Sequence, residues 1–342
     1  MGVYVNLINF IYTMLIHTMN VKAEEFIQNA YESLKTGNEE AALGFLKEAL
    51  GIDYEHEEVL YALKCLNWWL EKIYHLDDFY DPYEQGGYIL SQWDSYYEFL
   101  DRIGDTMLPM KEACDSCQYA VKRFVFLRAL NFYLTLLRDG SNQQDPELLL
   151  YTARCYKGAG DWEEALRFLE QAGRLKRDDS AILSELADVN ALLGGTRAAK
   201  VLFREAFYID PQGVDLRGLE SEMIRGLLEK VREQGYTGEE LAEWVPVWGC
   251  VWGIFSVKRE LKPVELGRLK QSILSLENEY RSSVAKSAHS ALIKPRLLNR
   301  YFWLIDHYES SRDSFGPTSG LIEETMLKIK FIDPIVHEHY KM

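Results

Sequence analysis

Two cysteines in this chain have the spacing of a chemically active pair. Cys114 and Cys117 are separated by two residues, as in zinc-binding and redox-active pairs. A structural zinc site takes four ligands, and no second cysteine pair or histidine pair lies near this one in the sequence. A redox pair would follow a strand at the start of a helix, whereas these cysteines fall inside a helical pattern. We therefore interpret the spacing as a coincidence.

Other chemical groupings are weaker. His337 and His339 lie near the C-terminus, where a solvated tail is the simpler interpretation. The glycines Gly194 and Gly195 are not followed by the lysine of a phosphate-binding loop, and the motifs of serine hydrolases and zinc proteases do not occur. One acidic cluster lacks the spacing of a calcium-binding loop: Asp77, Asp78, Asp81 and Glu84. The sequence thus predicts no enzyme activity, no cofactor and no metal site.

Two segments of 34 residues repeat each other between Pro146 and Gly213. Alanine, glycine and large apolar residues recur at the same places in both. The aligned pairs are Ala153 and Ala187, Ala165 and Ala199, Ala172 and Ala206, Leu149 and Leu183, Gly160 and Gly194, and Leu169 and Phe203. Alanine lets two helices approach while larger side chains fill the gaps, and glycine suits a left-handed helix end. Each segment is therefore predicted to be a pair of packed helices.

A third copy lies near the N-terminus. Ala30, Ala42 and Ala49 keep the same spacings of 12 and 7 residues. The matching apolar and glycine positions are Phe26, Gly37 and Leu46. One such helix pair cannot bury its apolar face alone, so neighbouring pairs are expected to stack into an array.

This pattern resembles the tetratricopeptide repeat (TPR) family. Two segments resemble the second half of the family motif: GAGDWEEALRFLEQAGRLKRD and GNEEAALGFLKEALGID. A third segment resembles nearly the whole motif: SELADVNALLGGTRAAKVLFREAFYIDP. Thr152, Asn190 and Gly195 followed by Thr196 depart from the family's preferred residues. The resemblance implies an all-α fold, a right-handed α-solenoid of helix hairpins, here with a helical C-terminal extension.

Three regions are expected along the chain. They are an apolar N-terminal segment (1–20), a TPR-like array (21–213) and a helical C-terminal region (214–342). The clear repeats are residues 23–56, 146–179 and 180–213. Residues 57–145 are expected to form two divergent helix pairs, with an insertion near residues 75–87 where Pro82 and the pair Gly86-Gly87 should break helices.

The N-terminal segment has 17 apolar or uncharged residues from Val3 to Met19. It lacks the basic start and the cleavage site of a signal peptide, and it is short for a membrane span. It is either an artefact of the assigned start or a capping helix, with a membrane anchor as the third alternative. We predict no stable membrane span and a cytoplasmic protein, since five cysteines in a long chain suggest reduced thiols.

The net charge of −15 is unevenly distributed. Residues 256–300 hold 10 Lys and Arg against 4 Asp and Glu, a charge of +6. Most of the remaining surface is acidic and would repel phosphates, which argues against nucleic acid as the main partner.

Two apolar features mark the C-terminal region. The stretch from Trp244 to Phe255 is expected to be buried where this region meets the array, or to form a protein-binding patch. A later helix carries apolar residues at alternating spacings of 3 and 4, as in a coiled-coil seam. The seam, which packs on its own domain or mediates self-association, consists of Leu266, Leu269, Ile273, Leu276 and Tyr280.

In the TPR family the first helix of each repeat lines a concave groove that binds a peptide. Carried over to this chain, the resemblance places nine residues in the groove: Ile27, Tyr31, Lys35, Leu150, Arg154, Lys157, Ser184, Asp188 and Ala191. The predicted function is a non-catalytic scaffold that binds a peptide or protein partner. The alternative is an enzyme or sensor whose site lies after Gly213, with the repeats as its recruiting module.

Overall fold

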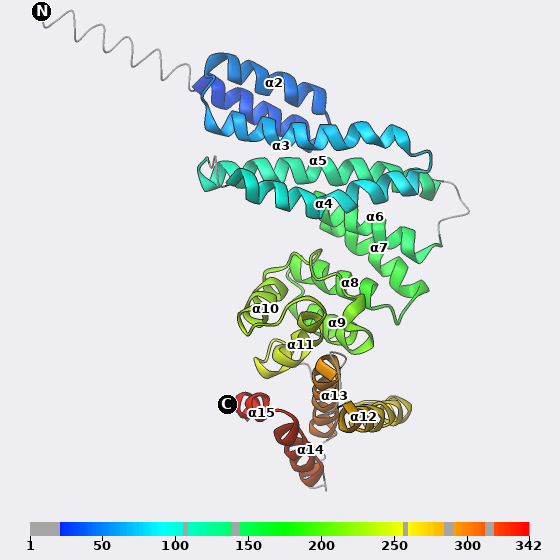
Figure 1. Ribbon diagram of the computed structural model, residues 1–342. Helices are drawn as coiled ribbons and strands as arrows, with labels where there is room; N and C mark the ends of the chain where they lie inside the picture. The colour runs from blue at the N-terminus through cyan, green and yellow to red at the C-terminus, as the bar shows by residue number, and fades with distance from the viewer. Residues whose placement is uncertain are drawn as a thin grey trace, which may run out of the picture. The chain divides into compact units, whose positions relative to one another are not determined.

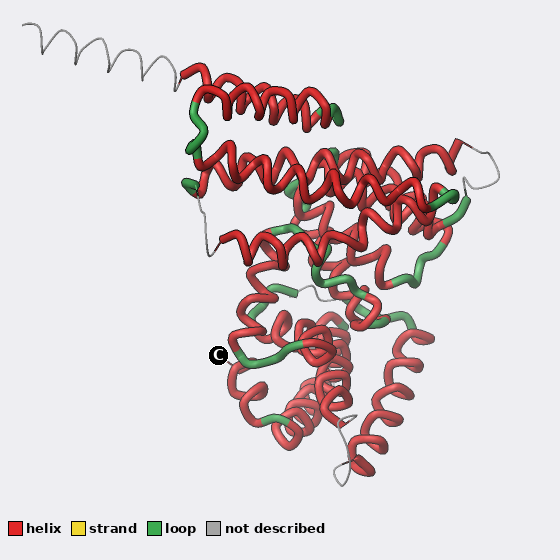
Figure 2. Tube along the Cα trace, turned by 45° about the horizontal axis from the view of Figure 1, so that its top comes forward, coloured by secondary structure: helices red, strands yellow, loops and turns green. Residues whose placement is uncertain are grey.

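The computed structural model describes residues 21–104, 109–138, 144–255, 259–283, 290–311 and 318–341. These residues form helices connected by loops and turns, and none of them lies in a strand (Figures 1 and 2). The predicted all-α fold is thereby confirmed for the described part of the chain. The apolar segment at residues 1–20 lies outside it.

The chain divides into two compact units, Met1–Phe168 and Leu169–Met342. Each unit has its own core: the buried residues of the first run from Ile27 to Cys155, and those of the second from Leu183 to Val336. The expected regions 21–213 and 214–342 divide the chain elsewhere. The difference arises because the core of the second unit joins the last repeat hairpin to the C-terminal helices.

The first unit begins with a helix over residues 21–35 and α2 (Glu39–Ile52). Gly37 between them has a φ of 81°, a left-handed conformation that glycine adopts without strain. The side-chain oxygen of Asn38 accepts the N–H of Ala41 at 3.0 Å and so caps α2. The three alanines predicted at the helix crossing are fully buried, namely Ala30, Ala42 and Ala49.

Three long helices and a short one follow: α3 (Glu57–Tyr74), η1 (His75–Asp78), α4 (Pro82–Gly104) and α5 (Lys111–Arg138). The helix break predicted at Gly86-Gly87 does not occur, because α4 begins at Pro82 and runs through both glycines. Gly86 serves close packing, since a β-carbon built on it would lie 2.7 Å from Cζ of Tyr133.

Aromatic residues from α3 and α4 pack in the core of the first unit. Trp69 and Tyr96 are fully buried. The Trp69 ring lies 5.4 Å from the Trp93 ring and 5.1 Å from that of Tyr96. Core packing is therefore the role of these three residues, whereas Tyr80 in the loop before α4 is 98% exposed.

The two repeats form the helices α6 (Pro146–Ala159), α7 (Trp162–Leu175), α8 (Ser180–Leu192) and α9 (Thr196–Ile209). The starts of α6 and α8, and those of α7 and α9, are each 34 residues apart. Gly160 and Gly194 both have a φ of 84°, as predicted for left-handed helix ends. All six aligned alanines are fully buried. The sequence repeat is thus a repeat of local structure.

The second unit continues with η2 (Pro211–Gly213), α10 (Glu222–Glu233), α11 (Gly238–Val251), α12 (Pro263–Ser283), α13 (Ser290–Ser310), α14 (Thr318–Ile332) and α15 (Pro334–Lys341). Pro246 and Pro295 lie inside α11 and α13, and both helices continue through these prolines. Trp244 and Phe255 are buried, and the Phe255 ring lies 5.9 Å from that of Phe207 in α9. The apolar stretch therefore packs against the last repeat, as predicted.

The seam of α12 faces the core of its own unit. Leu269 and Ile273 are buried, and Leu266, Leu276 and Tyr280 pack against the same core. The seam therefore packs on its own domain, while Leu266, Leu276 and Tyr280 stay partly exposed.

Candidate functional site

The groove residues predicted in the N-terminal copy are mostly buried. Ile27 and Tyr31 are each 1% exposed. The Tyr31 hydroxyl donates to Oε1 of Glu58 at 2.9 Å, and burial raises the pKa of that hydroxyl. Lys35 is partly exposed and forms an ion pair with Glu32 at 2.8 Å. Of these three residues, Lys35 alone offers a substantial part of its side chain to a ligand.

In the second copy, too, some of the predicted groove residues are buried and one is partly exposed. Leu150 is 8% exposed and Lys157 is 3% exposed, so both of these α6 side chains are buried. Arg154 is partly exposed, and its guanidinium lies 5.8 Å from the centre of the Tyr151 ring. Arg154 is therefore the residue of this copy that a partner could reach.

In the third copy, Ser184 and Asp188 are buried and form hydrogen bonds within the protein. Ser184 is 1% exposed and donates to the carbonyl of Ala181 at 3.0 Å. Asp188 is fully buried, and its two carboxylate oxygens accept the backbone N–H groups of Glu220 and Ser221 at 2.8 Å each. Ser221 is the residue before α10, so Asp188 anchors the start of that helix. Its role in this structure is to position backbone, and Ala191 remains partly exposed.

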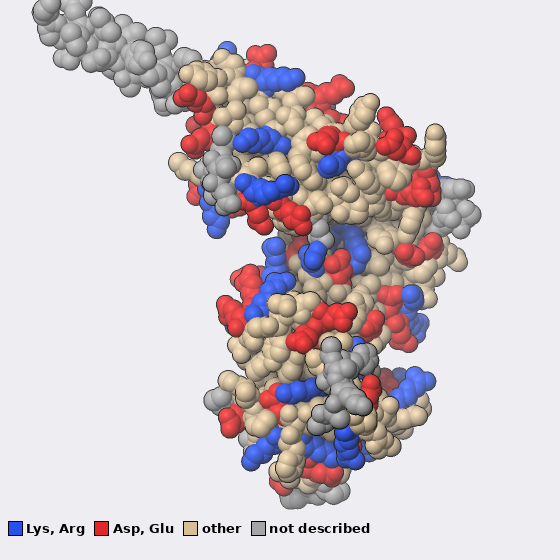
Figure 3. Space-filling view, in the orientation of Figure 1, with Lys and Arg blue, Asp and Glu red and all other residues tan. Residues whose placement is uncertain are grey.

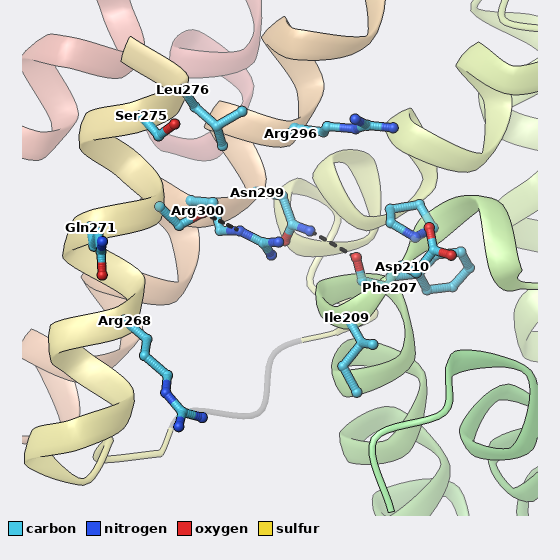
Figure 4. Close-up of a pocket in the computed structure, with 12 residues that line it drawn as sticks. Phe207, Ile209, Asp210, Arg268, Gln271, Ser275, Leu276, Arg296, Asn299 and Arg300 are labelled. Atoms are coloured by element: carbon cyan, nitrogen blue, oxygen red, sulfur yellow. Dashed lines mark hydrogen bonds between the residues drawn. The ribbon is translucent and has the colours of Figure 1, made fainter. Parts of the chain in front are cut away.

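No pattern in the sequence predicted the pocket between α9, α12 and α13 of the second unit, whose walls are partly polar and partly apolar. It has a volume of about 520 Å³ and opens between α12 and the end of α9 (Figure 4). Its lining residues are Phe207, Ile209, Asp210, Pro211, Arg268, Gln271, Ser272, Ser275, Leu276, Arg296, Asn299 and Arg300. The three arginines belong to the stretch 256–300, whose charge of +6 was the signal in the sequence. Only the tertiary structure shows that they share one pocket.

Arg296 is neutralised within the protein. Its Nε and Nη2 donate to Oε1 of Glu243 in α11 at 2.8 and 2.5 Å. Glu243 is fully buried and also accepts a hydrogen bond from Gln212 at 2.9 Å. The hydrogen bonds to Glu243 raise the pKa of Arg296. This pair joins α11 to α13 and fixes one wall of the pocket.

Arg300 is held differently. Its guanidinium lies 3.8 Å from the centre of the Tyr208 ring, within the range of a cation–π contact. Its Nε donates to Oγ of Ser272 at 3.4 Å. Burial lowers the pKa of Arg300, because the charged form has lost water. It forms no ion pair with a carboxylate among the residues that the structure describes.

Arg268 is exposed on α12 and extends beside the opening of the pocket (Figure 4). No carboxylate within the described ranges pairs with it. The neighbouring pocket, which Arg268 also lines, contains the carboxylates Asp178, Glu205 and Glu265. Glu205 and Glu265 bind Arg259, at 3.3 and 3.4 Å. Two of the three carboxylates in that pocket are thus engaged with another arginine.

Asp210 contributes a carboxylate to the wall of the pocket, and the other polar lining residues besides the arginines are neutral. Asn299 donates to the carbonyl of Phe207 at 3.2 Å, which leaves Gln271 and Ser275 as donors toward the pocket. The lining contains no histidine or cysteine that could act as a base or a nucleophile. This arrangement of basic and neutral polar groups can bind an anion.

The charges of the exterior are mixed. On the face shown in Figure 3, acidic and basic side chains are interspersed over the described residues.

None of the described helices combines the length and the apolar character that crossing a bilayer requires. No model of a known protein family and no curated protein sequence matches this chain.

Proposed function

We propose that this chain is a non-catalytic scaffold that binds a peptide or protein partner through a right-handed solenoid of TPR-like hairpins. The observation that carries the proposal is the 34-residue offset shared by α6 with α8 and by α7 with α9. Stacked hairpins of this kind create extended surfaces suited to binding other chains. Five free cysteines support a reducing compartment, the cytoplasm.

The alternative, an enzyme or sensor in the C-terminal region, finds no support in the apolar stretch of α11. An enzyme site at the stretch from Trp244 to Phe255 would require a polar pocket there. Trp244, Val245, Val247 and Trp248 are instead buried in an apolar core. A packed apolar interior at this place favours a structural role for α11 and a binding function for the chain.

The test uses the two basic groove residues that are partly exposed. Full-length protein captures partners from a lysate of its own cells, in parallel with the double variant K35A/R154A. The control is R174A, which removes a charge from α7 at a side chain 77% exposed. We expect a partner that binds the wild type and R174A and that the double variant loses. A partner retained equally by all three proteins, or no partner at all, would contradict binding through this surface.

A further inference from the structure

We propose that the pocket between α9, α12 and α13 binds a phosphate monoester through Arg268 and Arg300. None of the lining residues of this pocket is one of the nine predicted groove residues, so the inference does not depend on peptide binding by the repeats. The argument rests on charge balance, on the directions from which donors reach the pocket, and on the way that Arg300 is held.

The charges of the pocket do not balance, and the arginines leave an excess of positive charge that an anion could neutralise. Glu243 neutralises Arg296, and the wall residue Asp210 also lies near Arg296, where its charge helps to raise the pKa of the guanidinium. Arg268 and Arg300 have no carboxylate partner among the described residues. Arg300 is only partly exposed, and its loss of water lowers its pKa although the charge of Glu243 opposes that shift. A bound anion would supply the missing counter-charge.

The geometry favours a tetrahedral oxyanion over a planar carboxylate. Arg268 comes from α12 and Arg300 from α13, so two guanidinium groups reach the pocket from different helices (Figure 4). Gln271 and Ser275 add neutral donors on the α12 side. A carboxylate is satisfied by one bidentate guanidinium, whereas a phosphate presents three terminal oxygens to several donors. The apolar wall residues Ile209, Pro211 and Leu276 could contact the organic part of an ester.

Arg300 is already positioned before any ligand binds. The contact with the Tyr208 ring at 3.8 Å and the hydrogen bond to Ser272 at 3.4 Å restrict its side chain. A fixed guanidinium loses little conformational entropy when it binds an anion. Arg268 is exposed, so it can close on a ligand and remain accessible to substitution without loss of core packing.

The experiment titrates full-length protein by calorimetry at pH 7.5 and constant ionic strength. The ligands are inorganic phosphate, glycerol 3-phosphate, a serine-phosphorylated peptide, the same peptide unphosphorylated, and acetate. We expect the phosphate compounds to bind at least roughly tenfold more tightly than acetate or the unmodified peptide, since charge-assisted contacts to two arginines are strong. The tighter of glycerol 3-phosphate and the phosphopeptide identifies the source, a metabolite or a modified protein.

Two variants and a matched control complete the test. R268Q removes an exposed charge and should weaken phosphate binding by roughly tenfold or more. R300K keeps the charge and loses the planar fork, and it should also weaken binding. R225Q removes an exposed charge on α10, outside the pocket, and should leave affinity within about twofold of the wild type. Equal affinity of R268Q and wild type, or equal binding of acetate and phosphate, would overturn the proposal.

Discussion

At the scale of single residues, His307 shows how burial decides a protonation state. It lies in α13 and is 8% exposed, and its Nδ1 accepts the backbone N–H of Leu261 at 3.0 Å. Burial lowers the pKa of His307 below its ordinary value of 6.5, against the opposing charge of Glu260. A protonated Nδ1 could not accept this hydrogen bond, so the folded state holds the ring neutral.

This shift predicts a pH dependence of stability. The unfolded chain binds a proton at His307 more readily than the folded chain, so the free energy of unfolding falls as the pH decreases from about 7.5 to about 5.5. H307N keeps a hydrogen-bond acceptor and does not titrate. Urea denaturation at both pH values should show a smaller loss of stability in H307N than in the wild type. An identical loss in both proteins would contradict this role of His307.

At the scale of helices, glycines permit close packing inside α4, α6 and α11. A β-carbon built on Gly158 in α6 would lie 2.4 Å from the ring of Phe126 in α5. One built on Gly249 in α11 would lie 2.4 Å from the ring of Phe255. These glycines therefore set how near two helices, or a helix and its following turn, can approach.

The packing predicts opposite effects for two similar substitutions in the first unit. G158A should destabilise the protein by about 1–3 kcal/mol, because the clash with Phe126 outweighs the better helix propensity of alanine. G44A should stabilise it by about 0.5–1 kcal/mol, since a β-carbon on Gly44 in α2 meets no atom of the described residues within 4 Å. Urea denaturation measures both, and a stabilising G158A would refute the packing argument.

At the scale of the whole molecule, the two units have separate cores. Leu66 in α3 and Leu227 in α10 are both fully buried, one in each core. Each Leu→Ala substitution should reduce stability by about 2–5 kcal/mol. Hydrogen exchange read by peptide should rise in residues 21–168 for L66A and in residues 169–341 for L227A. If each substitution raised exchange equally in both units, the cores would behave as one.

Much of the fold could be predicted because it depends on local patterns. Alanine and glycine spacing determines how a hairpin closes, and this is visible along the chain at Ala153, Gly160 and Ala165. The errors arose where a residue's effect depends on distant neighbours. Gly86 and Pro246 look like helix breakers in sequence, yet α4 and α11 run through them, and Gly86 makes room for the ring of Tyr133 in α5.

The sequence by itself determined the helical class, the repeat offset and the apolar faces, since periodicity and small residues encode them locally. Only the tertiary structure decided which polar residues are accessible. Asp188 was expected in a groove and instead holds the start of α10, because the chain after Gly213 folds back onto α8. Arg268 and Arg300, 32 residues apart, share a pocket because α12 and α13 pack side by side. Such convergence depends on helix packing, which no local pattern records.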